Sequence, residues 1–467
     1  MDLSPLEERA KNIQLKIYQP DNTLYCIGHG GPLVEWHVRR PETLPAILKH
    51  PEINLGASYV RGDWDMDTRQ LPRLVQTLLP KLAKPGVLHN RPLVRRLLAR
   101  VSRKRARHLQ PHWQDMSLAV SRLCLGEDLF QACGWFSEPG VTLEQAQRTR
   151  CRRLLAKLRL ESGQRVLDLD AGWGSLTLFV AQHANLRVTA FCKTPEQLHH
   201  LQAEARRRGL QGRIQVRAGS LKRCRGPFDR ILAGGLLEQC PPSGYAALFR
   251  RLSNLLRDDG FAWLQMSGRS RGVMLSNRWL QNQLPSWHAL PLLSDLGAAL
   301  ESTDLRILQL DDCSAHWHKS LESWGQRFCR HRTAITRQFG ETLTRYWEFM
   351  LASQQTASGW GQLGCYEIVL GNPRSAWLPG EEMAHGFLDD LPLDLGRSIP
   401  GLAGDLLLQV PAQVIGEVSL VEAAAEVEED LALQQVLGLG FQRQDLAEDL
   451  YYARRDRAPT VAASNRG

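Results

Sequence analysis

Two glycines that follow a short apolar run could form a binding loop for an anion or a nucleotide. The run VLDLDAGWGS covers residues 166–175 and places Gly172 and Gly174 after the apolar residues. A glycine loop lets the backbone approach a nucleotide or an amino-acid tail closely, and the start of a following helix favours an anion. We expect Asp168 to anchor this loop and Trp173 to pack beside it.

The elements that would position this loop alternate between strands and helices from Gln164 onward. Strands are predicted at the short apolar runs 165–170, 186–192, 214–219, 228–235 and 260–268, and helices at 195–209 and 244–259. This alternation predicts an α/β fold with a doubly wound parallel sheet and helices on both faces. Ligands of such folds bind outside the carboxyl ends of the strands, where the glycine loop falls.

The rest of the chain divides into three further segments. Residues 1–90 begin with strand-like runs around the turn PDN and then become helical, which predicts a small mixed α/β domain. A basic linker and helical cap are expected at 91–150, where Thr142 suits the start of a helix. The doubly wound domain is expected at 151–374. Residues 375–467 form an acidic, proline-interrupted extension whose role the sequence does not indicate.

Composition and charge narrow the class of protein. The 467 residues are 43% hydrophobic and 23% charged, without a run of about 20 apolar residues or a signal-peptide pattern at the start. We therefore expect a cytoplasmic protein. The ten cysteines form no CxxC pair and no metal-ligand spacing with histidine, so we expect reduced thiols and no metal site.

The net charge of +9 favours an anionic partner. Residues 91–108, RPLVRRLLARVSRKRARH, place arginine and lysine around leucine and valine at helical spacing. A basic amphipathic helix of this kind is typical of surfaces that bind anionic lipid, although a solvated helix with a packed inner face has the same pattern. No interleaving of aromatic and basic residues supports nucleic-acid binding.

Five motifs, taken in order and spacing, resemble one known family. They are LGASYVRGDWDMD at 55–67, TLEQAQ at 142–147, AGWGS at 171–175, TPEQ at 194–197 and SLESWGQRF at 320–328. With the strand, loop, helix, DDG turn and strand at 228–265, they resemble the cyclopropane-fatty-acyl-phospholipid synthases, which are class I S-adenosylmethionine-dependent methyltransferases. The resemblance covers residues 12–371 and implies a Rossmann-like fold with S-adenosylmethionine as cofactor.

Members of that family transfer a methylene unit from S-adenosylmethionine across the cis double bond of a phospholipid acyl chain, and relatives leave a methyl branch. The resemblance implies the same substrates here. An alkene that attacks an electrophilic methyl group becomes a cation, which must be shielded from water and then lose a proton. The family uses a bound bicarbonate for this step, held by a cysteine, a glutamate, a histidine, a tyrosine and backbone groups.

Only part of that anion site is carried over to this chain. The family's cysteine falls on Cys133 in QACGWF and its glutamate on Glu238 in LLEQCP. The histidine position is Gln265 and the tyrosine position is Trp317. Glutamine can hydrogen-bond an anion but cannot take its proton, and tryptophan has no hydroxyl group. The resemblance thus implies bicarbonate at a site in which two of the four side chains differ in kind.

The cofactor site also departs from the family pattern. Asp170 stands where the first glycine is expected, next to the place of the cofactor's own carboxylate. Such a pair of like charges costs about 1 to 4 kcal/mol, so we expect S-adenosylmethionine to bind weakly or not at all. Thr194 and Gln197 are carried over, whereas Ser220 replaces an acidic residue near the adenine. The expected cofactor site is completed by the loop residues Asp168, Gly172, Trp173 and Gly174.

Two interpretations stay open at this point. The family resemblance favours an active transferase that modifies unsaturated acyl chains of phospholipids. The substitutions favour a catalytically inactive relative that acts as a lipid-binding or partner subunit, alone or as an oligomer. Both interpretations imply a protein that binds peripherally to an anionic membrane surface, at the inner face of the membrane.

Overall fold

The computed structural model describes residues 3–79, 117–183, 185–219, 221, 224–269, 277–283 and 290–375. These residues all belong to one compact unit. Three features predicted from the sequence lie outside the described residues: the basic helix at 91–108, the candidate cofactor residue Ser220, and the extension from residue 376 onward.

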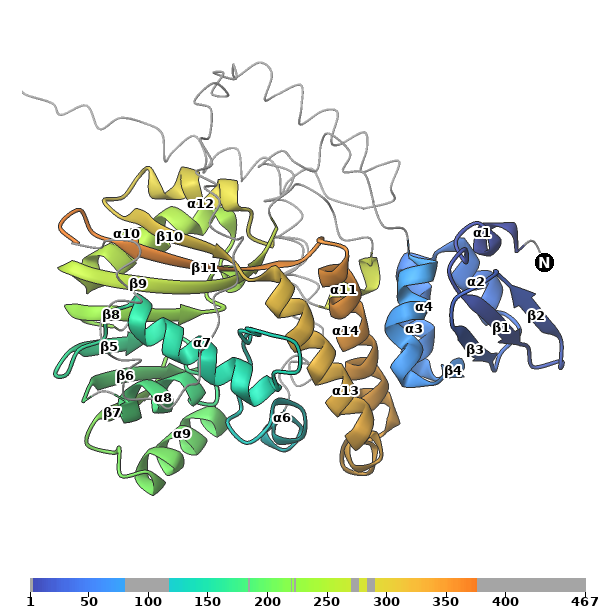
Figure 1. The fold of residues 1–467 in the computed structure, drawn as a ribbon, viewed down its shortest axis with the longest axis horizontal. Helices are drawn as coiled ribbons and strands as arrows, with labels where there is room; N and C mark the ends of the chain where they lie inside the picture. The colour runs from blue at the N-terminus through green and yellow to red at the C-terminus, as the bar shows by residue number, and fades with distance from the viewer. Residues whose placement is uncertain are drawn as a thin grey trace, which may run out of the picture. The chain divides into compact units, whose positions relative to one another are not determined.

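A mixed sheet of seven strands carries the glycine loop, and its order β10-β11-β9-β8-β5-β6-β7 can be followed in Figure 1. The strands span β5 Arg165–Asp168, β6 Arg187–Cys192, β7 Ile214–Ala218, β8 Phe228–Gly234, β9 Leu256–Gly268, β10 Arg306–Asp312 and β11 Gly364–Gly371. β5 to β9 pair in parallel as predicted, and β10 and β11 add an antiparallel edge. Because β6 and β8 lie on opposite sides of β5, strand order reverses there, which is where ligands of such sheets bind.

Helices cover both faces of this sheet because successive strand residues are buried on opposite sides. Val166 and Leu232 pack in one hydrophobic cluster with residues of α7, α8 and α9, whereas Leu167 and Ile231 pack in another with residues of α10 and α12. The helices span α7 Leu143–Lys157, α8 Ser175–His183, α9 Pro195–Arg207, α10 Tyr245–Leu255 and α12 Leu293–Leu300. This arrangement confirms the doubly wound fold.

The N-terminal elements form a second sheet of four strands, ordered β2-β1-β3-β4. Its elements span α1 Ser4–Glu7, β1 Gln14–Tyr18, β2 Leu24–Ile27, β3 Leu33–Val38, α2 Thr43–Lys49, α3 Pro51–Arg61, β4 Trp64–Met66, η1 Thr68–Gln70 and α4 Leu71–Leu78. β1 and β2 form the antiparallel hairpin that the PDN turn predicts. In β3, Val34, Trp36 and Val38 are buried and alternate with exposed residues, as in a strand with one face on a core.

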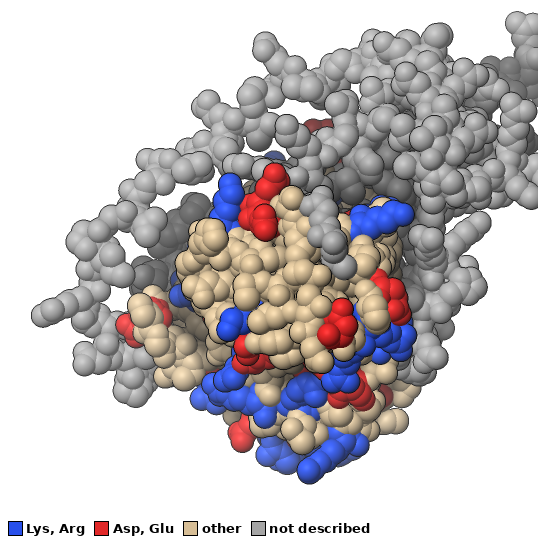
Figure 2. Space-filling view, turned by 90° about the vertical axis from the view of Figure 1, so that its right-hand side faces the viewer, with Lys and Arg blue, Asp and Glu red and all other residues tan. Residues whose placement is uncertain are grey.

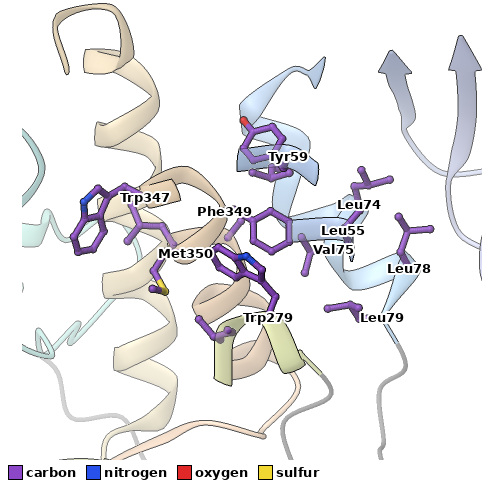
Figure 3. Close-up of a cluster of buried hydrophobic side chains, with 14 of the residues drawn as sticks. Leu55, Tyr59, Leu74, Val75, Leu78, Leu79, Trp279, Trp347, Phe349 and Met350 are labelled. Carbon is purple, nitrogen blue, oxygen red and sulfur yellow. The ribbon is translucent and has the colours of Figure 1, made fainter. Parts of the chain in front are cut away.

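Helices from the second half of the chain close the N-terminal core. These are α6 Leu118–Leu125, α11 Arg278–Gln283, α13 Ser314–Phe339 and α14 Glu341–Gly359. Figure 3 shows Trp279 of α11 and Phe349 of α14 among the leucines of α3 and α4. A Cβ at Gly56 would lie 2.6 Å from both rings, so glycine permits this close approach. Tyr59 Oη also donates to Glu348 Oε2 at 2.8 Å. The motif at 55–67 therefore joins the N-terminal sheet to α14.

Charged side chains on the N-terminal face are mixed in sign. Figure 2 shows Lys and Arg next to Asp and Glu over the lower part of this face, below an area with few charges. Within the N-terminal elements, four arginines form ion pairs with nearby aspartates: Arg39 with Asp65, Arg40 and Arg61 with Asp63, and Arg69 with Asp67. The described part of this face therefore presents no large patch of one sign. Among the described helices, none has the length and apolar character needed to cross a bilayer.

Candidate active site

The glycine loop follows β5 and leads into α8, as predicted. Gly172 and Gly174 have φ angles of 54° and 87°, in the left-handed region that favours glycine. A Cβ at Gly174 would lie 2.3 Å from Leu201 Cδ1, so this glycine lets the loop pack against α9. A Cβ at Gly172 would meet no described atom within 4 Å. Among the described residues, the loop is therefore open beside Gly172.

Asp168 anchors the loop, as expected. Its buried carboxylate accepts a hydrogen bond from Thr177 Oγ1 at 2.6 Å and one from the backbone N–H of Asp170 at 3.3 Å. Burial raises the pKa of Asp168 to about 6, and the charge of Asp170 acts in the same direction. Both hydrogen bonds tie the end of β5 to the loop and to the first turns of α8.

Trp173 packs beside the loop, also as expected. The residue is buried, and its Nε1 donates to Ser121 Oγ at 3.1 Å. The indole ring meets the ring of His200 edge-on, with centroids 5.7 Å apart. Trp173 therefore links the loop to α6 on one side and to α9 on the other.

Thr194 and Gln197, both expected at the cofactor site, form the capping box of α9. Thr194 Oγ1 accepts from the backbone N–H of Gln197 at 3.2 Å, and Gln197 Oε1 accepts from the backbone N–H of Thr194 at 3.4 Å. Reciprocal bonds of this kind satisfy the free N–H groups at a helix start. These contacts explain both residue types without a ligand.

Asp170 is paired, which changes the electrostatics expected from the sequence. Its Oδ2 accepts from Lys193 Nζ at 2.6 Å and from Gln239 Nε2 at 3.0 Å. Lys193 follows β6, and Gln239 ends η5 (Leu237–Gln239), which follows β8. An ammonium group at this distance offsets the charge of the carboxylate. The repulsion predicted for an unpaired Asp170 therefore does not apply to the loop as it is folded.

Glu238 lies in η5, beside the end of β9. Its Oε1 accepts from the backbone N–H of Ser267 at 2.5 Å, whereas its Oε2 is shielded from solvent and has no hydrogen-bond partner among the described residues. Burial raises the pKa of Glu238 to about 7, and the charge of Asp170 adds to this effect. A carboxylate that titrates near neutrality and keeps one oxygen free is suited to accept a proton.

Cys133, Gln265 and Trp317 come together around two further cysteines. Cys133 forms a buried cluster with Cys313 and Cys365, and Trp317 packs against this cluster, which we call the thiol cluster. Gln265 Nε2 donates to Cys365 Sγ at 3.2 Å. Trp317 Nε1 is shielded from solvent and has no partner among the described residues. Burial raises the pKa of the Cys133 thiol, so this group stays protonated.

Sequence reasoning missed a buried charge network that holds Gln265. Arg150 Nη2 donates to Gln265 Oε1 at 2.7 Å, and Arg150 Nε lies 3.4 Å from Glu367 Oε1. Lys157 Nζ lies 2.9 Å from Glu367 Oε2 and 2.6 Å from Asp311 Oδ2. The side chains of Arg150 and Lys157 are only 5% and 1% exposed. The charges of two cations and two carboxylates thus offset one another, and Gln265 links this network to the thiol cluster.

A signal for this network is present in the sequence of α7. Five buried positions recur at intervals of three and four residues: Leu143, Gln147, Arg150, Leu154 and Lys157. Cations on the buried stripe of a helix need buried partners. Those partners lie 154 and 210 positions beyond Lys157, and nothing in the helix itself identifies them.

Comparisons with known proteins agree with the resemblance seen in the five motifs. The family model for mycolic acid cyclopropane synthetase matches residues 101–368. A probable fatty acid methyltransferase of Pseudomonas putida is 24% identical over 372 residues, which is 77% of this chain and 92% of that protein. The cyclopropane-fatty-acyl-phospholipid synthase of Escherichia coli K12 is 23% identical over 334 residues, 69% of this chain and 84% of that protein.

A solved structure shares the fold. The mycolic acid cyclopropane synthase CmaA1, complexed with SAH and CTAB, superposes with a TM-score of 0.52 at 20% sequence identity. The superposition covers 56% of this chain and 99% of that chain. This likeness confirms a class I methyltransferase fold for the seven-stranded sheet and its helices.

Proposed function

The chain belongs to the mycolic acid cyclopropane synthetase family, and from this premise we propose that it transfers a methyl or methylene group from S-adenosylmethionine to unsaturated acyl chains of membrane phospholipids. The cofactor supplies an electrophilic methyl group when it is bound. The observation that carries the proposal is Glu238, whose Oε2 is shielded from water, unpaired among the described residues, and part of a carboxyl group with a pKa of about 7. A cation formed on an acyl chain requires such a proton acceptor.

Two further requirements of the reaction are the exclusion of water and the binding of a small anion, and we assign these to the thiol cluster, Trp317 and Gln265. The thiol cluster and Trp317 provide a weakly polar wall that excludes water from a cation. Two donors fit a small anion such as bicarbonate: the unpaired Nε1 of Trp317 and the second N–H of the Gln265 amide. Neither of these side chains can take a proton, so among the side chains of the site we assign proton removal to Glu238.

The second candidate function is a catalytically inactive relative that binds lipid or a partner subunit. The observation that favours it is Gln265, whose amide is fixed by Arg150 at 2.7 Å and by Cys365 at 3.2 Å. A fixed amide at this position contributes a hydrogen bond but no acid or base.

Mass spectrometry of phospholipid products separates the two functions. The full chain is incubated with S-adenosylmethionine and vesicles of an unsaturated phosphatidylglycerol, and the acyl chains are then analysed. An active transferase adds one CH2 unit per modified chain. Binding of the cofactor without any gain of mass would support the inactive relative and contradict the transferase.

We also propose that the basic segment 91–108 attaches the protein to anionic membranes. The segment lies outside the described residues, so its sequence alone carries this proposal. Each basic residue near an anionic surface contributes about 1 kcal/mol within a Debye length of about 8 to 10 Å. The paired arginines of the N-terminal face contribute less, because neighbouring aspartates offset their charge.

Sedimentation with anionic vesicles tests this attachment. The protein should sediment at low salt and be released at about 0.5 M salt. The variant Arg95→Glu, Arg96→Glu, Arg103→Glu should stay in the supernatant. A matched control reverses three exposed arginines elsewhere, Arg206, Arg217 and Arg225, and should sediment like the parent. If both triple variants sediment as the parent does, the membrane contact lies on another surface.

A further inference from the structure

We propose that Asp170 and Lys193 together recognise the amino-acid tail of S-adenosylmethionine, with Asp170 binding the α-ammonium group and Lys193 the α-carboxylate. The inference rests on the proposed function, because it assigns two residues to one end of the cofactor. In this proposal Asp170, which the sequence predicted to weaken cofactor binding, is instead a residue that binds the cofactor.

The position of the pair follows from the sheet order. β6, β5 and β8 are neighbours, so the residues that follow them meet at one edge of the sheet, where the strand order reverses. Asp170 follows β5, Lys193 follows β6, and Gln239 follows β8. A Cβ at Gly235, at the end of β8, would lie 3.7 Å from Asp170 Oδ2. The open side of the loop at Gly172 begins two residues after Asp170.

Each member of the pair keeps hydrogen-bonding capacity for a ligand. Asp170 Oδ2 accepts from Lys193 and Gln239, while Oδ1 accepts no hydrogen bond from the described residues. Lys193 uses one of its three N–H groups on Asp170. Gln239 Nε2 also donates to the carbonyl oxygen of Gly235 at 2.6 Å, and this bond holds the orientation of Asp170.

Charge and exposure favour a ligand over a purely structural role. An α-amino acid group carries a positive and a negative charge on one carbon, and an acidic and a basic side chain 2.6 Å apart present the complementary pair. The side chain of Asp170 is 11% exposed and that of Lys193 is 46% exposed. An ion pair this exposed adds little to stability, so its removal should affect binding more than folding.

Calorimetric titration of the full chain with two probes tests the inference. S-adenosylhomocysteine carries the amino-acid tail, and 5′-methylthioadenosine has the same adenosine and thioether without it. Asp170→Asn and Lys193→Met should each weaken S-adenosylhomocysteine binding about tenfold or more, as expected for loss of a charged hydrogen-bond partner. Binding of 5′-methylthioadenosine should not change. Asp128→Asn, which removes an exposed pair with Arg148, serves as the control and should leave both affinities unchanged.

Three other results of the titration would contradict the proposal that Asp170 and Lys193 bind the amino-acid tail. Unchanged S-adenosylhomocysteine affinity in both variants would place the tail elsewhere and leave the proposed function intact. An equal loss for both probes would show that the pair supports the loop rather than the tail. If neither probe binds the unaltered protein, the proposed function fails and the inference fails with it.

Discussion

The cofactor loop and the thiol cluster lie at the same end of the sheet, and both carry unusual residues for this family. At the loop, Asp170 brings a charge that Lys193 offsets at 2.6 Å, and space remains open beside Gly172. At the thiol cluster, Gln265 stands where the family resemblance implies a histidine, and its amide oxygen accepts a hydrogen bond from Arg150. A new charge can be offset by a neighbour, whereas a lost proton carrier needs another residue that titrates. The charge of Asp170 is therefore offset within the loop, whereas the proposed proton transfer has to rely on Glu238.

The largest expected effect concerns the network that fixes Gln265. Arg150→Met leaves the buried carboxylate of Glu367 with Lys157 alone, which Asp311 shares, and breaking a buried ion pair in this way costs about 3 to 5 kcal/mol of unfolding free energy. Chemical denaturation measures the change. Arg148→Met, two residues earlier in an exposed pair with Asp128, should cost no more than about 1 kcal/mol.

A double variant sharpens this test. Arg150→Met combined with Glu367→Gln restores the balance of one cation and one carboxylate, so it should recover most of the lost stability. If the single and double variants are equally unstable, packing rather than charge explains the role of Arg150. Loss of less than about 1 kcal/mol in the single variant would show that the network is hydrated and contributes little.

The next effect concerns catalysis. Glu238→Gln keeps an acceptor for the Ser267 N–H but removes the base, so turnover on unsaturated phospholipid vesicles should fall by about 100-fold or more. Cys133→Ala should lower turnover about tenfold or more, because the thiol packs against Cys365, the cross-strand neighbour of Ser267, whose N–H Glu238 accepts. Glu161→Gln, at an exposed position, is the control with the same change of charge. Turnover like that of the parent in both site variants would remove this site from the mechanism.

A smaller effect is expected from pH. Because the pKa of Glu238 is raised to about 7, the base is mostly protonated at pH 6 and mostly ionised at pH 8. Turnover should therefore rise about tenfold between these two values, and the rise should be absent from the residual activity of Glu238→Gln. The same raised pKa lowers the stability of the parent as the pH rises from about 4.5 to about 7, so Glu238→Gln should be more stable than the parent at pH 8. A profile that is flat from pH 6 to 8 would contradict the assignment of Glu238 as the base.

The sequence predicts the elements that depend on local pattern. Strands β5 to β8, the hairpin of β1 and β2, and the helix start at Thr142 lie where alternation, turn residues and capping residues place them. Strand β9 begins at Leu256, inside the segment 244–259 that was predicted to be helical, so the end of that helix was predicted wrongly. The antiparallel strands β10 and β11 and the packing of α14 on α3 were not predicted, because they depend on pairs far apart in the chain. The Tyr59 bond to Glu348, for example, spans 289 positions.

The sequence predicted only part of the candidate site, because the rest depends on residues that are far apart in the chain. The loop glycines and Asp168 follow from one short run of sequence, and the family resemblance adds Cys133 and Glu238. Lys193 was missed because its partner Asp170 lies 23 positions earlier, in the loop after a neighbouring strand, and their contact depends on the sheet order. Because that pairing was not foreseen, the sequence predicted that Asp170 would repel the cofactor carboxylate, whereas in the fold Lys193 offsets the charge of Asp170.

The proposed function requires the loop of this chain to bind S-adenosylmethionine, although Asp170 stands where the family resemblance implies a glycine. Calorimetric titration of the purified full chain with S-adenosylmethionine tests it most directly. The pairing of Asp170 with Lys193 and the open space beside Gly172 predict saturable binding of one cofactor per chain in the micromolar range. If no binding is detected at millimolar S-adenosylmethionine, the loop does not bind the cofactor and the proposed function is wrong.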